Sequence, residues 1–143
     1  MNTQLQREIG AMRKSPQQHL DELRKALLHL HKVLLEIERT DYEKIHGRVS
    51  AGELLRLVIQ DVQFAWLRPV SEIIVKIDEL LDGEEPLEEG ADRRLSRQTQ
   101  DLLVPAEAGS AFARNYHLAL QGVPDAVLAH RAVRLVLSNS AAS

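Results

Sequence analysis

Apolar residues recur with helical spacing along most of the chain. The clearest series is Leu20, Leu23, Leu27, Leu30, Leu34 and Ile37. Its alternating steps of three and four residues place these side chains on one stripe of an α-helix. Ser15 stands at the N-cap, Pro16 at the first helical position and Gly47 just past the end. The pattern therefore predicts a helix from Pro16 to His46, about 46 Å long, whose apolar stripe other helices must cover.

Shorter helical signals follow this long helix. Ser50 and Glu53 have the spacing of a capping box, in which each side chain accepts from the other residue's amide. The apolar residues within 54–59 then predict a short, largely buried helix. Asp61 is expected to cap a further turn, which runs through Phe64, Ala65, Trp66 and Leu67.

The second half of the chain continues in the same way. Pro69 is expected to break the chain or to open a helix with one broad apolar face, which Gly83 ends. That face carries Ile73, Ile74, Ile77, Leu80 and Leu81. Further helices are predicted over residues 92–103, 106–121 and 125–137.

Strand signals are nearly absent, because no segment sustains a two-residue alternation. We therefore expect an all-α fold, a single helical bundle of about four main helices plus short extra helical turns. Residues 1–14 are expected to form an N-terminal arm or weak helix, 15–138 the bundle, and 139–143 a disordered tail. The predicted core joins the leucine stripe to Leu55, Val58, Trp66, Ile74, Ile77 and the last helix.

Composition narrows the chemistry. The chain has 143 residues and no cysteine, which excludes disulfides, thiolate metal sites and a catalytic thiol. Its formal net charge of −3 does not favour nucleic-acid binding. The apolar runs are too short to span a membrane and the N-terminus has no secretory signal, so we expect a cytoplasmic protein with no membrane partner.

Charge is unevenly distributed. Seven acidic residues lie between Asp78 and Glu89 with no basic residue among them. They fit either a solvated loop after a helix or a docking site for a basic partner or a divalent cation. Arg93, Arg94 and Arg97 follow directly. They are interpreted as offsetting these acids, with a phosphate or an acidic partner as the alternative.

No motif for nucleotide binding or nucleophilic catalysis is present, so no catalytic residue is predicted. Glu43 and His46 lie three residues apart, which puts a carboxylate and an imidazole on one helix face. Dimetal bundles use two such units and two further glutamates, whereas this chain offers one unit. Glu43 and His46 are thus weak metal candidates, and the alternative is a histidine near the carbonyls of a helix end. No cofactor is predicted.

The segment from Asp61 to Glu79 holds the chain's single tryptophan. Arg68 lies between Trp66 and Pro69, where its guanidinium is expected to pair with Asp61 or Glu72. One interpretation is a small pocket or contact surface at a helix junction. The other is a structural corner. Candidate contacts for a ligand or partner are Asp61, Trp66, Arg68 and Glu72.

The stretch from Leu30 to Leu81 also carries a resemblance. Its elements are HKVLLE at 31–36, Tyr42-Glu43, Gly47, SAGELL at 50–55 and FAWLRPVSEIIVKIDE at 64–79. Together they resemble a group of small bacterial all-helical proteins that share an FAWLRPxSExIVxIDE-type segment, with a looser echo in the last two helices. The resemblance implies a bacterial cytosolic helical protein and no particular activity.

These observations favour a non-enzymatic cytosolic helical protein that binds a protein partner or itself, for example as a homodimer. The triplets Ala26-Leu27-Leu28 and Val33-Leu34-Leu35 are wider than one stripe requires, as in a helix with a second contact face. The alternative is a bundle that binds a small ligand or metal through histidine and glutamate residues. Its candidates are His31, Glu43, His46 and Arg68.

Overall fold

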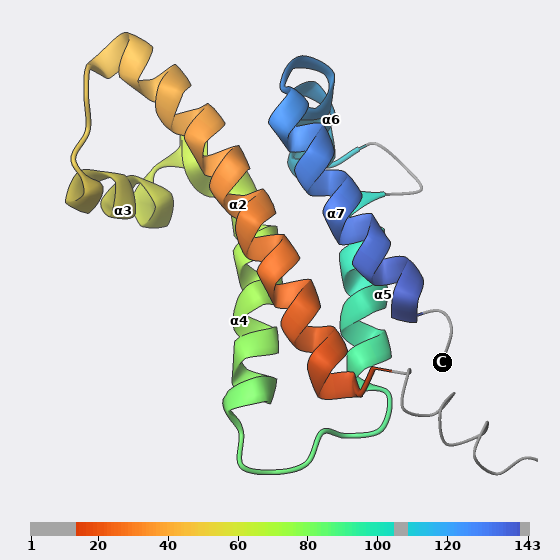
Figure 1. Ribbon diagram of the computed structural model, residues 1–143. Coiled ribbons are helices and arrows are strands. Elements are labelled where there is room, and N and C mark those ends of the chain that lie inside the picture. The colour runs from red at the N-terminus through yellow and green to blue at the C-terminus, as the bar shows by residue number, and fades with distance from the viewer. Residues whose placement is uncertain (1–13, 105–108, 141–143) are drawn as a thin grey trace, which may run out of the picture.

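The computed structural model describes residues 14–104 and 109–140 (Figure 1). Within these residues the chain forms α2 (Pro16–His46), α3 (Ala51–Gln60), the 3₁₀ helix η1 (Val62–Leu67), α4 (Arg68–Asp82), α5 (Ala91–Leu103), α6 (Ala111–Gly122) and α7 (Pro124–Ser140). The described residues contain no strand, and the all-α prediction is confirmed. The expected count of about four main helices is only roughly matched.

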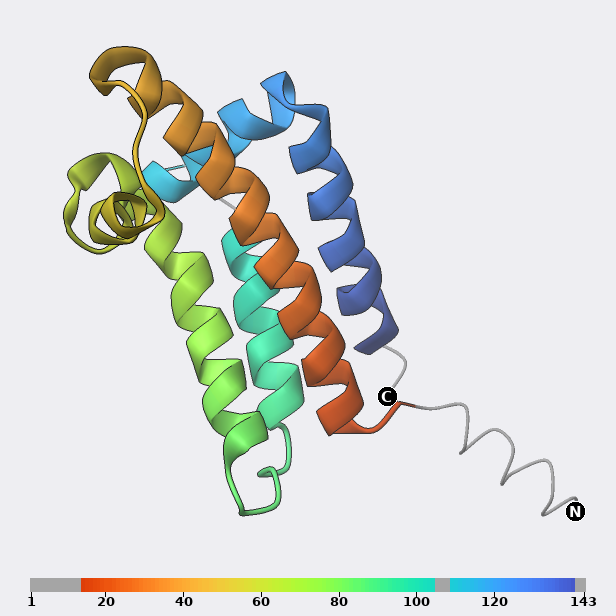
Figure 2. The same ribbon diagram turned by 60° about the vertical axis from the view of Figure 1, so that its left-hand side comes forward.

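Helices α2, α4, α5 and α7 lie side by side and run alternately up and down (Figures 1 and 2). Helix α2 contacts all three of the others. At the end of the bundle where α2 terminates, η1 and α6 pack beside each other, and α3 lies to one side. This end of the bundle therefore combines parts of α2, α3, η1 and α6.

The predicted leucine stripe forms the centre of the core. Leu20, Leu23, Leu27, Leu30 and Leu34 are fully buried, and Ile37 is half-buried against them. At the start of α2, Ser15 Oγ accepts from the Gln18 amide and Gln18 Oε1 accepts from the Ser15 amide, a complete capping box. At the other end, Gly47 has φ 81°, a backbone conformation that favours glycine.

The prediction of a largely buried helix after Gly47 is wrong. Of the apolar residues of α3, only Leu57 is buried, whereas Leu55 and Ile59 are 62% and 58% exposed. The reason is that α3 packs mainly against η1, so one side of the helix is covered. Leu55 is therefore not a core residue. The predicted capping box is half formed, because Ser50 Oγ accepts from the Glu53 amide while no return bond from Glu53 is present among the described residues.

The boundaries of the later helices differ in places from those expected. Pro69 opens α4, as one of the two predicted alternatives had it. Helix α6 starts at Ala111 and is capped by Ser110, whereas the start expected near residue 106 lies outside the described residues. Helix α7 continues to Ser140, so the expected disorder is wrong for residues 139 and 140. The expected N-terminal arm, except for Lys14, and the last three residues of the tail lie outside the described residues.

The apolar triplets of α2 are mostly used inside the molecule. Ala26, Val33 and Leu35 pack against the core, and Leu28 remains exposed. The apolar triplets therefore do not give α2 a second contact face. Among the described helices, none combines the length and apolar character needed to cross a bilayer.

Candidate functional site

Trp66 joins three elements at the end of the bundle. Its indole Nε1 donates to Glu38 Oε1 on α2 at 2.8 Å, and its ring packs at 5.7 Å from that of Phe112 on α6. Gln63 Nε2 of η1 donates to the second oxygen of the same carboxylate at 3.0 Å. A buried indole N–H needs an acceptor, and here a carboxylate supplies it. Both oxygens of Glu38 are thus held in place by neutral donors.

A groove of about 630 Å³ opens beside this contact. It lies between η1, α6 and the second half of α2, and is lined by Glu38, Val62, Gln63, Ala65, Trp66, Pro69, Ser110, Ala111, Phe112 and Asn115. Within this lining, all of it in the described part of the chain, Glu38 alone carries a charge. No cation among the described residues pairs with Glu38. The groove is therefore mainly apolar, with one uncompensated carboxylate.

The aromatic contacts continue inward from the groove. Phe112 stacks on Tyr116 at 5.1 Å, and the Tyr116 hydroxyl lies 2.6 Å from Nδ1 of His130 on α7. Burial raises the pKa of Tyr116. Burial, and then the nearby Arg134, lower the pKa of His130. Both shifts favour neutral side chains, so the tyrosine hydroxyl donates and the imidazole accepts.

The four residues predicted to contact a ligand or partner do not form one site. Arg68 does not pair with Asp61 or Glu72; its guanidinium donates to the Ile59 carbonyl at 2.8 Å. That carbonyl lies in the last turn of α3, where helix carbonyls lack partners and attract a cation. Asp61 accepts from the Gln63 amide at 2.8 Å, and Glu72 is exposed with no bond to the described residues. Trp66 alone of the four lines the groove.

The metal candidates are occupied by structural contacts. Glu43 accepts from the Val49 amide at 2.9 Å and lies near Arg39, while His46 stacks on Tyr42 at 4.2 Å. Among the described residues, no group of three or more histidine and acidic side chains has the arrangement of a metal site. Glu43 instead holds the chain in place as it leaves α2.

His31 does not join these candidates. It lies on the same helix as Glu43, twelve residues earlier, which corresponds to about 18 Å. Its Nε2 atom is buried with no partner in the described part of the chain, and burial lowers the pKa of His31. His31 is thus a neutral histidine away from the other candidates.

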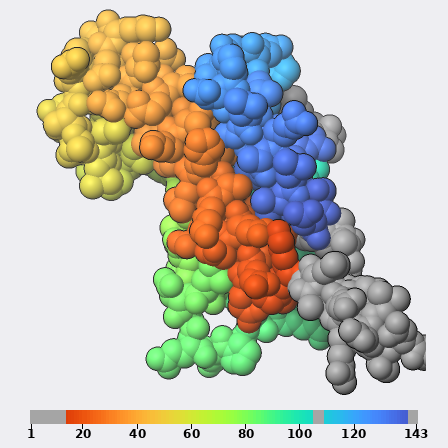
Figure 3. Space-filling model, in the orientation of Figure 1, coloured from red at the N-terminus to blue at the C-terminus, as the bar shows by residue number. Residues whose placement is uncertain are grey.

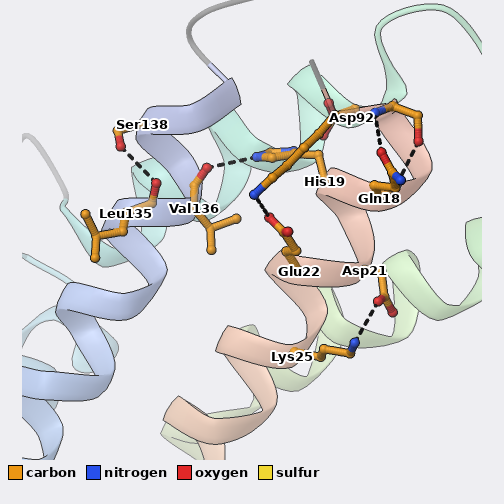
Figure 4. A network of polar contacts seen from close by, with 11 residues as sticks. Gln18, His19, Asp21, Glu22, Lys25, Asp92, Leu135, Val136 and Ser138 are labelled. Carbon is orange, nitrogen blue, oxygen red and sulfur yellow. Dashed lines mark hydrogen bonds and ion pairs between the residues drawn. The ribbon is translucent and has the colours of Figure 1, made fainter. Parts of the chain in front are cut away.

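His19 makes polar contacts with two other helices. Its Nδ1 atom lies 2.5 Å from Asp92 Oδ1 on α5, and its Nε2 atom lies 2.9 Å from the Val136 carbonyl oxygen on α7 (Figure 4). The residue is only 3% exposed. The side chain therefore ties α2, α5 and α7 together and has no room for a ligand.

The acidic and basic runs partly neutralise each other. Glu88 pairs with Arg94 at 2.9 Å, which confirms that interpretation for Arg94. Asp78 pairs with Arg24 of α2 at 3.3 Å. The Glu88–Arg94 pair is exposed, and an exposed pair contributes at most about 1 kcal/mol.

The exposed side of α3 is a second surface feature of this end, where Ile45 of α2 and Val62 of η1 are also exposed. We call Leu55 and Ile59 the α3 face. They lie one turn apart on a helix that protrudes beside the end of α2 (Figure 3). Arg68 and Asp61 anchor the C-terminal end of α3, so the face is presented by a fixed helix.

The sequence did not single out Glu38, Gln63 or Phe112. Glu38 lies in α2 among ordinary charged residues, and its contact with Trp66 spans 28 positions. The one available signal was the indole itself, since a core tryptophan requires an acceptor. A buried indole predicts an acceptor such as a carbonyl or a carboxylate, but it does not identify the residue that supplies it.

Comparison with known proteins adds no family. The chain matches no protein-family model, no curated protein and no solved structure.

Proposed function

We propose that this chain is a non-enzymatic interaction protein of the bacterial cytoplasm, that α3 is its docking element, and that its partner is a second copy of the chain. The observation that carries the proposal is the α3 face. Leu55 and Ile59 are both more than half exposed, although they belong to the most apolar stretch of their helix. Covering such side chains removes apolar surface from water and favours association.

The spacing of the face permits a symmetric contact between two copies of the chain. Leu55 and Ile59 are four residues apart, so two copies of α3 can pair in antiparallel fashion around a two-fold axis. Leu55 then meets the partner's Ile59, and Ile59 meets the partner's Leu55. Such an isologous contact uses the same patch on both copies and closes at a dimer.

The small size of α3 sets the expected strength. Its ten residues span about 15 Å, whereas stable interfaces bury about 800 Å² per partner. We therefore expect a weak dimer that forms as the protein concentration rises.

Sedimentation velocity over a range of concentrations tests the proposal. The wild-type protein is expected to shift from monomer to dimer, and Leu55→Glu and Ile59→Glu are expected to remain monomeric. Leu128→Glu on α7 is the matched control, because Leu128 is 63% exposed and lies on another helix. It should dimerise like the wild type. A wild-type protein that stays monomeric, or a control as disruptive as the α3 variants, contradicts the proposal.

A further inference from the structure

We propose that the groove between η1 and α6 binds a small organic amine, with its ammonium group against Glu38 and its apolar body against Trp66 and Phe112. This inference does not depend on the proposed self-association, because Leu55 and Ile59 do not line the groove.

The charge of the groove selects a cation. Glu38 is half-buried, and both of its oxygens accept from neutral donors, Trp66 and Gln63. Each carboxylate oxygen can accept a further hydrogen bond. A partly buried charge without a counter-ion is unfavourable, and an ammonium group in the groove compensates it. An anionic ligand meets repulsion at the same place.

The remaining lining selects an apolar body. Apart from Glu38, the walls are formed mainly by apolar side chains and two aromatic rings, those of Trp66 and Phe112. A cation near such rings gains additional electrostatic attraction. The volume of about 630 Å³ lies within the usual range for small-molecule sites, about 300–1,000 Å³.

Asn115 supplies a second acceptor. Its Nδ2 donates to the Ala111 carbonyl at 2.9 Å, so its side-chain oxygen is the part left for a ligand. An ammonium group has three hydrogens to donate, and Glu38 and Asn115 both line the groove. A primary amine therefore fits better than a quaternary one.

Trp66 provides the readout, because it is the only tryptophan in the chain. Its fluorescence is followed while the protein is titrated with 2-phenylethylamine, and separately with 2-phenylethanol, which has a similar shape and no charge. We expect saturable binding of the amine and affinity for the alcohol that is weaker by about tenfold, the equivalent of one charge-assisted contact. Equal affinities, or no saturable change with the amine, overturn the proposal.

Glu38→Gln tests the role of the carboxylate, since it keeps an oxygen that accepts from the Trp66 indole. Amine affinity is expected to fall about tenfold in this variant and alcohol affinity to stay the same. Unchanged amine affinity in a folded Glu38→Gln protein overturns the proposal. If the variant does not fold, the comparison of amine and alcohol on the wild-type protein still decides the question.

Discussion

Replacing His19 by alanine is expected to destabilise the fold more than any other histidine substitution. The side chain is nearly fully buried and contacts Asp92 on α5 and the Val136 carbonyl on α7. Alanine removes both contacts; a neutral imidazole carries one N–H, so at least one of these two acceptors loses its donor. Each unsatisfied buried group costs about 1–3 kcal/mol. Because the Asp92 side chain is 17% exposed, water satisfies part of its need.

These contributions give a loss of about 3 kcal/mol in the free energy of unfolding. With a urea m-value of about 1.5 kcal/mol per molar, the unfolding midpoint falls by about 2 M. The assay is urea unfolding followed by circular dichroism and by Trp66 fluorescence. His29→Ala, an exposed position on the same helix, is the control and should change stability by less than about 0.5 kcal/mol.

A double-mutant cycle with Asp92→Ala separates the histidine–aspartate contact from other effects. We expect a coupling energy of about 1–3 kcal/mol between the two positions. A loss below about 1 kcal/mol for His19→Ala, or no coupling to Asp92, refutes the view that this histidine ties the three helices together.

Three further predictions concern stability. Gly47→Ala should destabilise the fold by about 1–2 kcal/mol because Gly47 has φ 81°. Gly52→Ala should stabilise the fold by about 0.5 kcal/mol, because the added Cβ meets no neighbouring atom. Thermal unfolding of both variants checks the opposite signs. Leu27→Ala in the buried stripe should lower the free energy of unfolding by about 3 kcal/mol. Leu28→Ala, at an exposed position, should lower it by less than about 1 kcal/mol. Similar losses for the two variants in urea unfolding contradict the assigned stripe. Burial lowers the pKa of His130, so the unfolded chain binds a proton at this residue more readily than the folded chain does. The stability contribution is therefore greatest above the ordinary histidine pKa of about 6.5 and falls as the pH drops below it. His130→Gln should flatten that part of the stability–pH profile, and an unchanged slope contradicts the assignment.

The sequence predicted the elements well and their packing only in part. The leucine stripe of α2 was visible because helical periodicity repeats along one segment, and the caps at Ser15 and Gly47 are local signals. The exposure of Leu55 and Ile59 was not visible, since an apolar run shows that a helix has an apolar side and does not show what covers it. For α3 the main neighbour is the short η1, which covers one side.

The candidate site was predicted least well because its contacts are long-range. Glu38 meets Trp66 across 28 positions, and His19 meets Asp92 across 73. No local spacing encodes such pairs. The interpretation of Trp66 as a residue at a helix junction was useful, but its acceptor became identifiable only when η1 and α2 were placed side by side.

Disulfide trapping across α3 tests the central claim most directly, because the wild-type chain has no cysteine. A Leu55→Cys chain and an Ile59→Cys chain are mixed, oxidised and analysed by peptide mass mapping. Random pairing in an equimolar mixture gives twice as many 55–59 links as 55–55 or 59–59 links. The antiparallel dimer predicts a 55–59 share well above that ratio, and it predicts little linking of a Leu128→Cys chain alone. Links in random proportion, or as much dimer from Leu128→Cys, contradict the assignment of α3 as the surface through which the chain associates with itself.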